Sequence, residues 1–275
     1  MSDDEPDVNI SGGADGGGSV AEFATDEADT RAEAVVDELG ELYWRKAYGG
    51  QDAFECLVRT ILSQNTSDVA SQPAHDELMA RFGPGGTAPD AGPDLAATLA
   101  DAAQDEVAET ISSAGLYNRK SETIVRLAGR VREEYGGAAG FDEFVTRKEP
   151  AAVRDALLEM NGVGPKTADC VLLFAGGRSG VFPVDTHVHR IARRLGIAPP
   201  DADHETVREW IEAAVPPEKC GFGHTAMIQF GREYCTAREP KCLDGPEACP
   251  LYDLCDRVGV DELAGEFVDP AETVE

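Results

Sequence analysis

The chain has 275 residues, 42% of them hydrophobic, with 52 Asp and Glu residues against 24 Lys and Arg residues. This length and hydrophobic content allow one large or two small folded domains and exclude a chain that is disordered throughout. No apolar run approaches the roughly 20 residues that span a bilayer, and the acidic, Gly-rich N-terminus lacks the apolar core of a secretory signal. We therefore expect a soluble, cytoplasmic protein with no membrane partner.

The net charge of −28 at first argues against a nucleic-acid partner, because DNA is itself strongly negative. However, only six of the 24 basic residues are lysines, and the acidic residues are spread along the chain. This composition resembles that of proteins from halophilic archaea, whose salt-rich cytosol shortens the Debye length to about 3 Å or less. The charge therefore indicates a habitat and does not exclude DNA.

Apolar residues that recur at spacings of three and four predict a series of helices, and no stretch alternates with the period of a strand. Residues 1–30 are expected to form an acidic flexible tail, and the chain from Asp256 onward is expected to be partly disordered. The fold class is therefore all-α. The predicted helices run from Thr30 to just before Gly49, and over 54–63, 94–113, 119–135, 151–160, 167–175, 186–195 and 206–214.

A very short loop, Gly162–Gly164, joins two of these helices. Glycine at both ends permits positive φ, so the chain can reverse tightly and expose backbone N–H groups. With the N-terminus of the next helix, these groups form a site for one phosphate that reads no base sequence. Pro165 suits the first turn of that helix. Taken alone, the loop is equally well explained as a simple connector.

Asp185 stands where the next helix begins, after the apolar Val184. Asp in that position is an ordinary N-cap, which stabilises a helix by about 1 kcal/mol.

Five segments together resemble the helix-hairpin-helix Gly/Pro–Asp (HhH-GPD) superfamily of DNA glycosylases, specifically its endonuclease III branch. They are ILSQNTSD (61–68), GLYNRKSETI (115–124), LLEMNGVGPKTAD (157–169), PVDTHVHRIARRLG (183–196) and FGREYCTAREPKC (230–242). The resemblance covers about residues 31–257. It implies a six-helix barrel with the hairpin over 46–179, an iron–sulfur domain over 31–45 and 180–260, a tail over 261–275, and a DNA-binding cleft between the two domains. It also implies a monomer.

The resemblance assigns the chemistry to Lys166 and Asp185. The lysine after the hairpin attacks the sugar C1′ of a damaged nucleotide and forms a Schiff base, and β-elimination then cuts the strand. Burial at the positive end of a helix is expected to lower the pKa of Lys166 from about 10.4, which favours the neutral nucleophile. Asp185 would stabilise positive charge and assist proton transfer.

The target base must leave the stack, and inserted side chains repay part of that cost. By resemblance, Asn65, with Gln64 beside it, fills the gap and Leu116 wedges the opposite side. The bacterial pattern places a glutamine where this chain has Asn65, so the opposite-base preference stays open. The alternative for Leu116 is a position in the core.

Three of the seven cysteines (Cys56, Cys170 and Cys220) lie in apolar or helical stretches and are expected in the core. The odd total argues for metal binding by the others rather than for a disulfide framework. Four thiolates at wide spacing suit a [4Fe–4S] cluster, with zinc or unligated thiols as alternatives. The four candidate ligands are Cys235, Cys242, Cys249 and Cys255.

The family pattern of these ligands is C-x6-C-x2-C-x5-C, so the middle interval here carries four extra residues. Its Gly-Pro pair predicts a bulging loop, which a chain tolerates at little entropic cost. Arg238 and Lys241, in the first interval, are expected to contact phosphates, whereas Glu239 replaces a residue that is usually basic.

The resemblance therefore implies a base-excision glycosylase and AP lyase that acts on oxidised pyrimidines in double-stranded DNA. One alternative is an adenine-mismatch glycosylase of the same superfamily, which would lack the lysine. The other is a non-catalytic DNA-binding module whose metal only shapes a surface.

Overall fold

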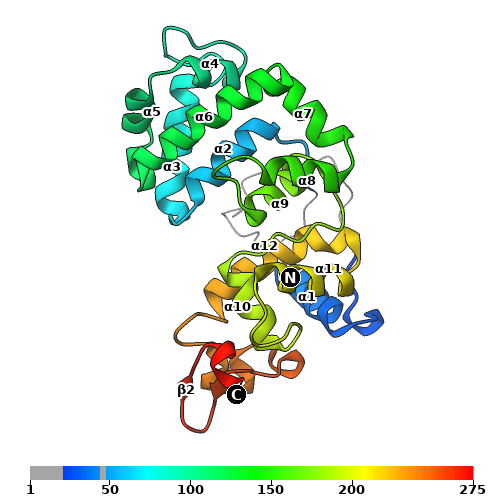
Figure 1. The fold of residues 1–275 in the computed structure, drawn as a ribbon. Coiled ribbons are helices and arrows are strands. Elements are labelled where there is room, and N and C mark those ends of the chain that lie inside the picture. Colours follow the sequence, from blue (N-terminus) through cyan, green and yellow to red (C-terminus); the bar gives the residue numbers. More distant parts are fainter. Residues whose placement is uncertain (1–20, 44–47, 275) are drawn as a thin grey trace. The chain divides into compact units, whose positions relative to one another are not determined.

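The computed structural model describes residues 21–43 and 48–274, and within them it confirms the all-α class. The chain divides into two compact units, one spanning Tyr48–Arg178 and the other formed by the segments on either side of it. Figure 1 shows the course of the chain through each unit. No helix in the described ranges is long and apolar enough to cross a membrane.

The unit Tyr48–Arg178 is built around helix α2 (Ala53–Ser63), which contacts α3, α6, α7 and α9. The Asp52 side chain caps α2 by accepting the Glu55 N–H at 2.8 Å. Most of the apolar side chains of α2 are fully buried, so it forms the centre of this core. The other helices are α3 (Asp68–Phe82), α4 (Leu95–Asp101), α5 (Gln104–Thr110), α6 (Tyr117–Tyr135), α7 (Ala138–Arg147), α8 (Pro150–Leu158) and α9 (Pro165–Phe174).

The second unit packs α1 (Arg31–Leu42) and α10 (Thr186–Leu195) against α12 (Pro217–Glu233), with α11 (His204–Ala214) beside α1 and α10. A buried ion-pair cluster joins two of these helices, because the Lys219 ammonium lies 2.7 Å from the carboxylates of both Glu33 and Asp37. After α12 the chain forms short 3-10 turns and a two-stranded antiparallel ribbon, β1 (Val260–Asp261) and β2 (Glu266–Phe267).

Three helices were not predicted from the sequence, namely α3, α7 and α12. Helix α3 has no clear apolar stripe and contains Pro73, which normally interrupts a helix. Helix α12 is buried on most sides, so its apolar residues do not follow a single face. The predicted helix over 94–113 is instead two short helices, α4 and α5, separated by extended backbone at Ala102 and Ala103.

Residues near both ends of the described ranges make tertiary contacts. Phe23, in the expected N-terminal tail, is buried with its ring centroid 4.5 Å from that of Phe222. At the other end, the Asp269 carboxylate accepts hydrogen bonds from Arg193 of α10 at 2.8 and 3.1 Å, and Pro270 is buried. The expectation that the chain from Asp256 onward is partly disordered stays a prediction.

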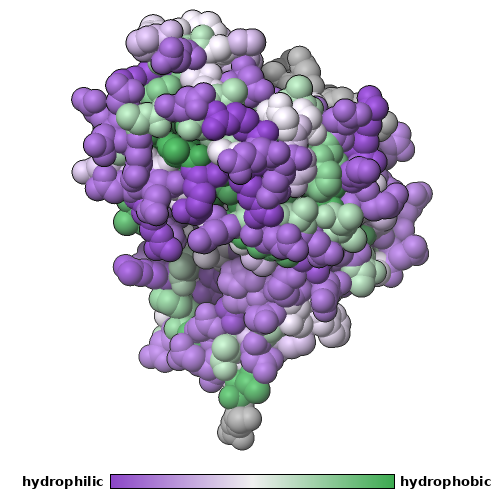
Figure 2. All heavy atoms as spheres, turned by 45° about the horizontal axis from the view of Figure 1, so that its top comes forward, coloured by the Kyte–Doolittle hydropathy of each residue, from purple (hydrophilic) through white to green (hydrophobic). Residues whose placement is uncertain are grey.

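Figure 2 shows one face of the molecule, on which hydrophilic residues cover most of the surface and apolar residues are scattered between them. This surface agrees with the acidic, polar composition of the chain.

Candidate active site and cysteine cavity

The hairpin between α8 and α9 uses its two glycines differently. Gly162 has φ +95°, and a Cβ there would lie 2.7 Å from Cγ2 of Thr123, so the turn requires glycine at this position. Gly164 has φ −99° and ψ 175°, an extended conformation open to any residue, and a Cβ there would meet nothing within 4 Å. The expected positive φ is therefore found at Gly162 only, and the fold itself does not require glycine at Gly164.

The backbone donors of this turn are also unequal. The Val163 N–H donates to the Met160 carbonyl at 2.9 Å, and the Val163 side chain is buried. That donor therefore closes the turn, and the expected contact of Val163 with DNA stays a prediction. In the part of the chain that the structure describes, the N–H groups of Gly162 and Gly164 have no intramolecular acceptor. These two donors are the ones that a ligand can use.

Lys166 is the second residue of α9, after Pro165 in the first position, and it is half-buried. Its charge reaches the buried Cys56 thiol, whose pKa is raised to about 12 by burial, with the Cys170 thiol adding to the rise and Lys166 opposing it. One turn along α9, the buried Asp169 accepts a 2.7 Å hydrogen bond from Nε of Arg154 in α8. This ion pair holds α9 against α8 and so holds the first turn of α9, which carries Lys166, in place.

The two predicted gap-filling residues are the only non-glycine residues with positive φ among the described residues of the unit Tyr48–Arg178. Asn65 has φ +51° and Leu116 has φ +49°. Both are exposed, Leu116 to 59%, so Leu116 is not a core residue. Left-handed backbone costs a non-glycine residue of order 1–3 kcal/mol, and such strain is typical of functional positions.

Gln64 does not project freely beside Asn65. Its Nε2 donates to the Gly162 carbonyl at 3.3 Å and to Oγ1 of Thr167 at 3.1 Å. These bonds connect the loop that carries Asn65 to the hairpin and to the first turn of α9.

Helix α6 supplies three residues that the sequence analysis did not single out. The Lys120 ammonium is buried and bonds to the Leu62 carbonyl at 2.7 Å and to the Ala114 carbonyl at 2.9 Å. Farther along α6, Arg126 donates to the Asn161 carbonyl at 3.0 Å and Arg130 to the Glu159 carbonyl at 2.8 Å. A sequence signal existed for Lys120, because it lies at helical spacing from Ile124 and so belongs to the buried face of α6.

In the second unit, Asp185 caps α10. Its Oδ1 accepts the backbone N–H groups of His187 and Val188, both at 2.9 Å, as expected for an N-cap. No donor to Oδ2 is found in the described ranges, and the side chain is half-exposed. Oδ1 of Asp185 therefore caps α10, while Oδ2 has no hydrogen-bond donor among the described residues.

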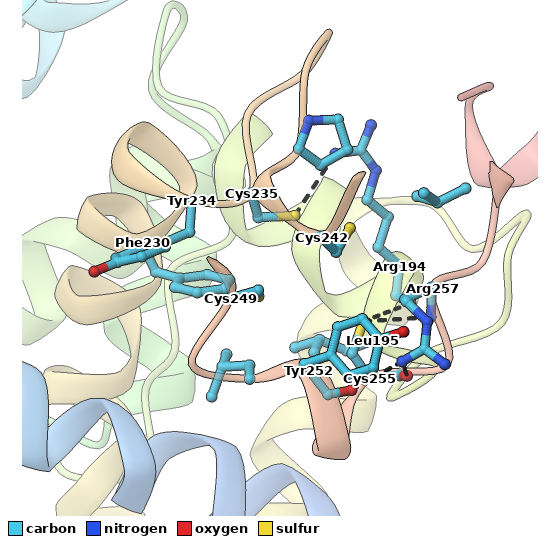
Figure 3. A pocket seen from close by; sticks show the side chains of 13 residues that line it. Arg194, Leu195, Phe230, Tyr234, Cys235, Cys242, Cys249, Tyr252, Cys255 and Arg257 are labelled. Carbon is cyan, nitrogen blue, oxygen red and sulfur yellow. Dashed lines mark hydrogen bonds between the residues drawn. The ribbon is translucent and has the colours of Figure 1, made fainter. Parts of the chain in front are cut away.

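All four C-terminal cysteines line one cavity, which has about 380 Å³ of atom-free space, part of it open to solvent. Figure 3 shows the four side chains around a common space, with Tyr234 and Tyr252 beside them. Leu251 also lines the cavity. Most of the middle interval, residues 243–248, lies in two 3-10 turns over 241–244 and 246–248, and Cys249 lies at the cavity. The lengthened interval therefore does not remove Cys249 from the other three cysteines.

Hydrogen-bond donors surround these sulfurs. Arg194 lies with Nη1 3.6 Å from Sγ of Cys235, and the Arg257 N–H donates to Sγ of Cys255 at 3.3 Å. Burial raises the pKa of Cys249 to about 11 and that of Cys255 to about 12. These thiols therefore stay protonated near neutral pH unless a bound cation stabilises their thiolates.

Four cysteine thiols around one cavity are the type of donor set that holds a [4Fe–4S] cluster. In a four-iron cluster each thiolate binds a different iron, so the sulfurs stand farther apart than around a single metal ion. Four cysteines around one cavity, with N–H groups directed at two of them, match that arrangement.

The loop between Cys235 and Cys242 presents its charged side chains to solvent. Arg238, Glu239 and Lys241 are all exposed, and Nζ of Lys241 lies 3.8 Å from the Asp244 carboxylate. Arg194 of α10 binds the backbone of this loop by donating to the carbonyls of Thr236 at 2.6 Å and Ala237 at 3.0 Å.

Comparisons with known proteins agree with these features. The model of the HhH-GPD superfamily of base excision DNA repair proteins matches residues 58–217. The chain is 31% identical over 205 residues to endonuclease III of Thermotoga maritima, covering 74% of this chain and 83% of that protein. It is 32% identical over 203 residues to endonuclease III of Escherichia coli K12, with the same coverage.

Among solved structures, the fold is similar to that of a trapped endonuclease III–DNA covalent intermediate. The TM-score is 0.65 at 27% identity, over 83% of this chain and 96% of that one. The hairpin, the lysine after it and the extent of both matches lead to one assignment: this chain belongs to the HhH-GPD superfamily of base excision DNA repair proteins and, within it, to the endonuclease III branch of DNA glycosylases.

Proposed function

We propose that this protein is a bifunctional DNA glycosylase and AP lyase that acts as a monomer on oxidised pyrimidines and abasic sites in double-stranded DNA. The observation that carries the proposal is the place of Lys166, half-buried in the first turn of α9 directly after the hairpin turn. The similar structure that is described as a trapped covalent endonuclease III–DNA intermediate supports covalent chemistry for this chain too.

In the first step the lone pair of the neutral Lys166 amine forms a bond to the sugar C1′. The bond from C1′ to the base breaks, and the base leaves with that electron pair and takes up a proton. The attached nitrogen loses a proton, its lone pair forms the C1′=N bond as the C1′–O4′ bond breaks, and O4′ takes up a proton, which leaves a protonated imine between Nζ and C1′.

In the second step the imine acts as an electron sink. A proton leaves C2′ and the C2′–H electron pair forms a double bond to C3′, while the C3′–O bond breaks and its own electron pair leaves with the phosphate. Water then hydrolyses the imine and returns Lys166. Asp185 supplies negative charge for the cationic intermediates and a carboxylate oxygen, Oδ2, for proton transfer.

The contacts with DNA are assigned to the hairpin and to the two exposed residues with left-handed backbone. The N–H groups of Gly162 and Gly164, with the N-terminus of α9, would hold one phosphate, and the missing side chain at Gly164 leaves room for it. The exposed Leu116 and Asn65 would enter the stack beside the extruded base.

We also propose that Cys235, Cys242, Cys249 and Cys255 hold a [4Fe–4S] cluster. When bound, such a cluster cross-links residues 235–255 through four iron–thiolate bonds. Cys235 and Cys242 bracket the loop that carries Arg238 and Lys241, so their ligation would fix this loop for phosphate contacts. The support is the cavity that all four cysteines line.

Borohydride trapping tests the proposed chemistry. Wild-type protein mixed with an abasic duplex and sodium borohydride should give a covalent protein–DNA adduct, because reduction fixes the imine. Lys166→Gln should abolish the adduct, whereas the matched control Lys148→Gln, at an exposed lysine of the same unit, should retain it.

The alternatives predict other results. A monofunctional adenine-type glycosylase would release adenine from a mispair and give no adduct, and a non-catalytic module would bind both duplexes unchanged. Thymine glycol duplexes assayed beside adenine mispairs identify the lesion class. Absence of an adduct with wild type overturns the lyase proposal.

A further inference from the structure

The Lys120 side chain lies inside the unit Tyr48–Arg178 with only 4% of the residue exposed. Its Nζ bonds to three acceptors: the Leu62 carbonyl at 2.7 Å, Oγ1 of Thr66 at 2.5 Å and the Ala114 carbonyl at 2.9 Å. An ammonium group has three N–H donors, so the three acceptors satisfy it completely.

None of these acceptors carries a charge. In the described ranges, no ion pair includes Lys120, and burial lowers its pKa. A buried ammonium without a carboxylate partner is costly, and a neutral side chain would fill the same core position at lower cost. Stability of the core therefore does not explain why a lysine occupies this position and makes these three hydrogen bonds.

The three acceptors belong to two segments that are about fifty residues apart in sequence. Leu62 and Thr66 bracket Asn65, while Ala114 lies two residues before Leu116. Oγ1 of Thr66 also bonds to the Ala114 carbonyl at 2.5 Å, so the two segments are joined directly as well. Asn65 and Leu116 are the two exposed residues with left-handed backbone described above.

We propose that Lys120 is a positioning residue that locks the Asn65 loop and the Leu116 loop into one rigid unit for insertion into the DNA stack. This inference rests on the proposed function, because it assigns the two loops to base extrusion. Lys120 itself touches no reacting atom. The ammonium holds both strained turns in the inserted shape before DNA binds, so the duplex does not have to order them.

The test separates base extrusion from chemistry. The fluorescence of 2-aminopurine placed beside the target nucleotide reports extrusion on binding and needs no catalysis. Cleavage of a single-stranded abasic oligonucleotide needs the imine chemistry and no insertion into a duplex. Lys120→Met removes the ammonium with little change in volume, and Leu127→Ala, on the buried face of the same helix, is a control for lost stability alone.

Lys120→Met should lower the extrusion signal and the kcat on a lesion duplex at least tenfold, while single-stranded cleavage stays within about twofold of wild type. Leu127→Ala should leave the extrusion signal unchanged at a temperature where it is folded. Adding Leu116→Ala to Lys120→Met should cost no more than Leu116→Ala alone, because both changes disable the same unit.

Equal losses on duplex and single-stranded substrates, or effects that multiply in the double variant, would overturn the inference. If Lys120→Met does not fold, Thr66→Val removes one acceptor and the direct bond between the segments while leaving the ammonium in place. An unchanged extrusion signal in folded Thr66→Val would also overturn the inference about Lys120. Wild-type protein that extrudes the base but gives no borohydride adduct would refute the lyase proposal and leave the role of Lys120 standing.

Discussion

Oδ1 of Asp185 accepts the backbone N–H of Val188 at 2.9 Å, so the aspartate assigned to catalysis is also the N-cap of α10. These two roles can be separated, because asparagine caps helices about as well as aspartate but carries no charge. The His187 N–H shares the same oxygen.

Asp185→Asn should therefore change the free energy of unfolding by less than about 0.5 kcal/mol, whereas Asp185→Ala should lower it by about 1 kcal/mol. Both variants should slow strand cleavage by about 10²-fold, the usual contribution of a proton-transfer group. Urea unfolding and single-turnover cleavage measure the two effects. An Asp185→Asn protein that cleaves at the wild-type rate would restrict Asp185 to capping.

The two hairpin glycines should respond differently to alanine. Gly162→Ala forces a side chain into left-handed backbone and against Thr123, so it should destabilise the unit by about 1–3 kcal/mol. Gly164→Ala should leave stability within about 0.5 kcal/mol, because its backbone is extended and the space is open. It should instead weaken DNA binding at least tenfold, by blocking the phosphate. Thermal unfolding measures the loss of stability, and fluorescence anisotropy measures the affinity for DNA. A Gly164→Ala protein that binds DNA with wild-type affinity would contradict the proposed phosphate site.

The cysteine cavity predicts the metal content of the purified protein. Wild type should contain iron and acid-labile sulfide and should be coloured, and Cys249→Ala should lose both. Cys220→Ala is the matched control, because Cys220 is buried outside the cavity, and it should keep the iron. A colourless protein with one zinc per chain would contradict the cluster.

The exposed basic residues of the loop 236–241 predict a small and specific salt effect. Arg238→Ala and Lys241→Ala should each reduce the slope of log affinity against log salt by about 0.9, the value for one phosphate contact. Lys148→Ala, at an exposed lysine outside the loop, should leave the slope unchanged. Titrations at several salt concentrations measure it. A shallow overall slope would also agree with the salt-rich habitat that the composition indicates, and unchanged slopes in both loop variants would exclude these contacts.

The Asp269 carboxyl predicts a pH-dependent part of stability. Its pKa is lowered, because Arg193 donates two hydrogen bonds to it. A lowered folded-state pKa stabilises the protein above the unfolded value of about 3.9, and this stabilisation is lost as the pH falls through the folded-state pKa. Asp269→Asn should thus cost less than about 1 kcal/mol at pH 7, because the Asp269 side chain is 49% exposed and solvent screens the ion pair, and the difference from wild type should shrink below about pH 4. Urea unfolding across that range tests it, and a difference that does not vary with pH would contradict the assignment.

Helix periodicity predicted the elements whose apolar residues lie on one face. Helix α10 has the predicted bounds, and α2, α8 and α9 begin or end within two residues of them. The method failed where burial is not one-sided, as in α12, and where the stripe is weak, as in α3. Periodicity could not reveal the Arg193–Asp269 contact, because it joins residues far apart in sequence.

The sequence by itself determined the family, the lysine after the hairpin and the four cysteines, because each depends on residue type and spacing along one segment. Only the tertiary structure decided how these residues are held. In the folded chain the Val163 N–H closes the hairpin turn. One carboxylate oxygen of Asp185 caps α10, and the other has no donor among the described residues. Cys249 lies at the cavity although the interval before it is longer than in the family pattern. The tertiary structure also placed Lys120 between two loops about fifty residues apart, and such long-range hydrogen bonds have no period in the sequence.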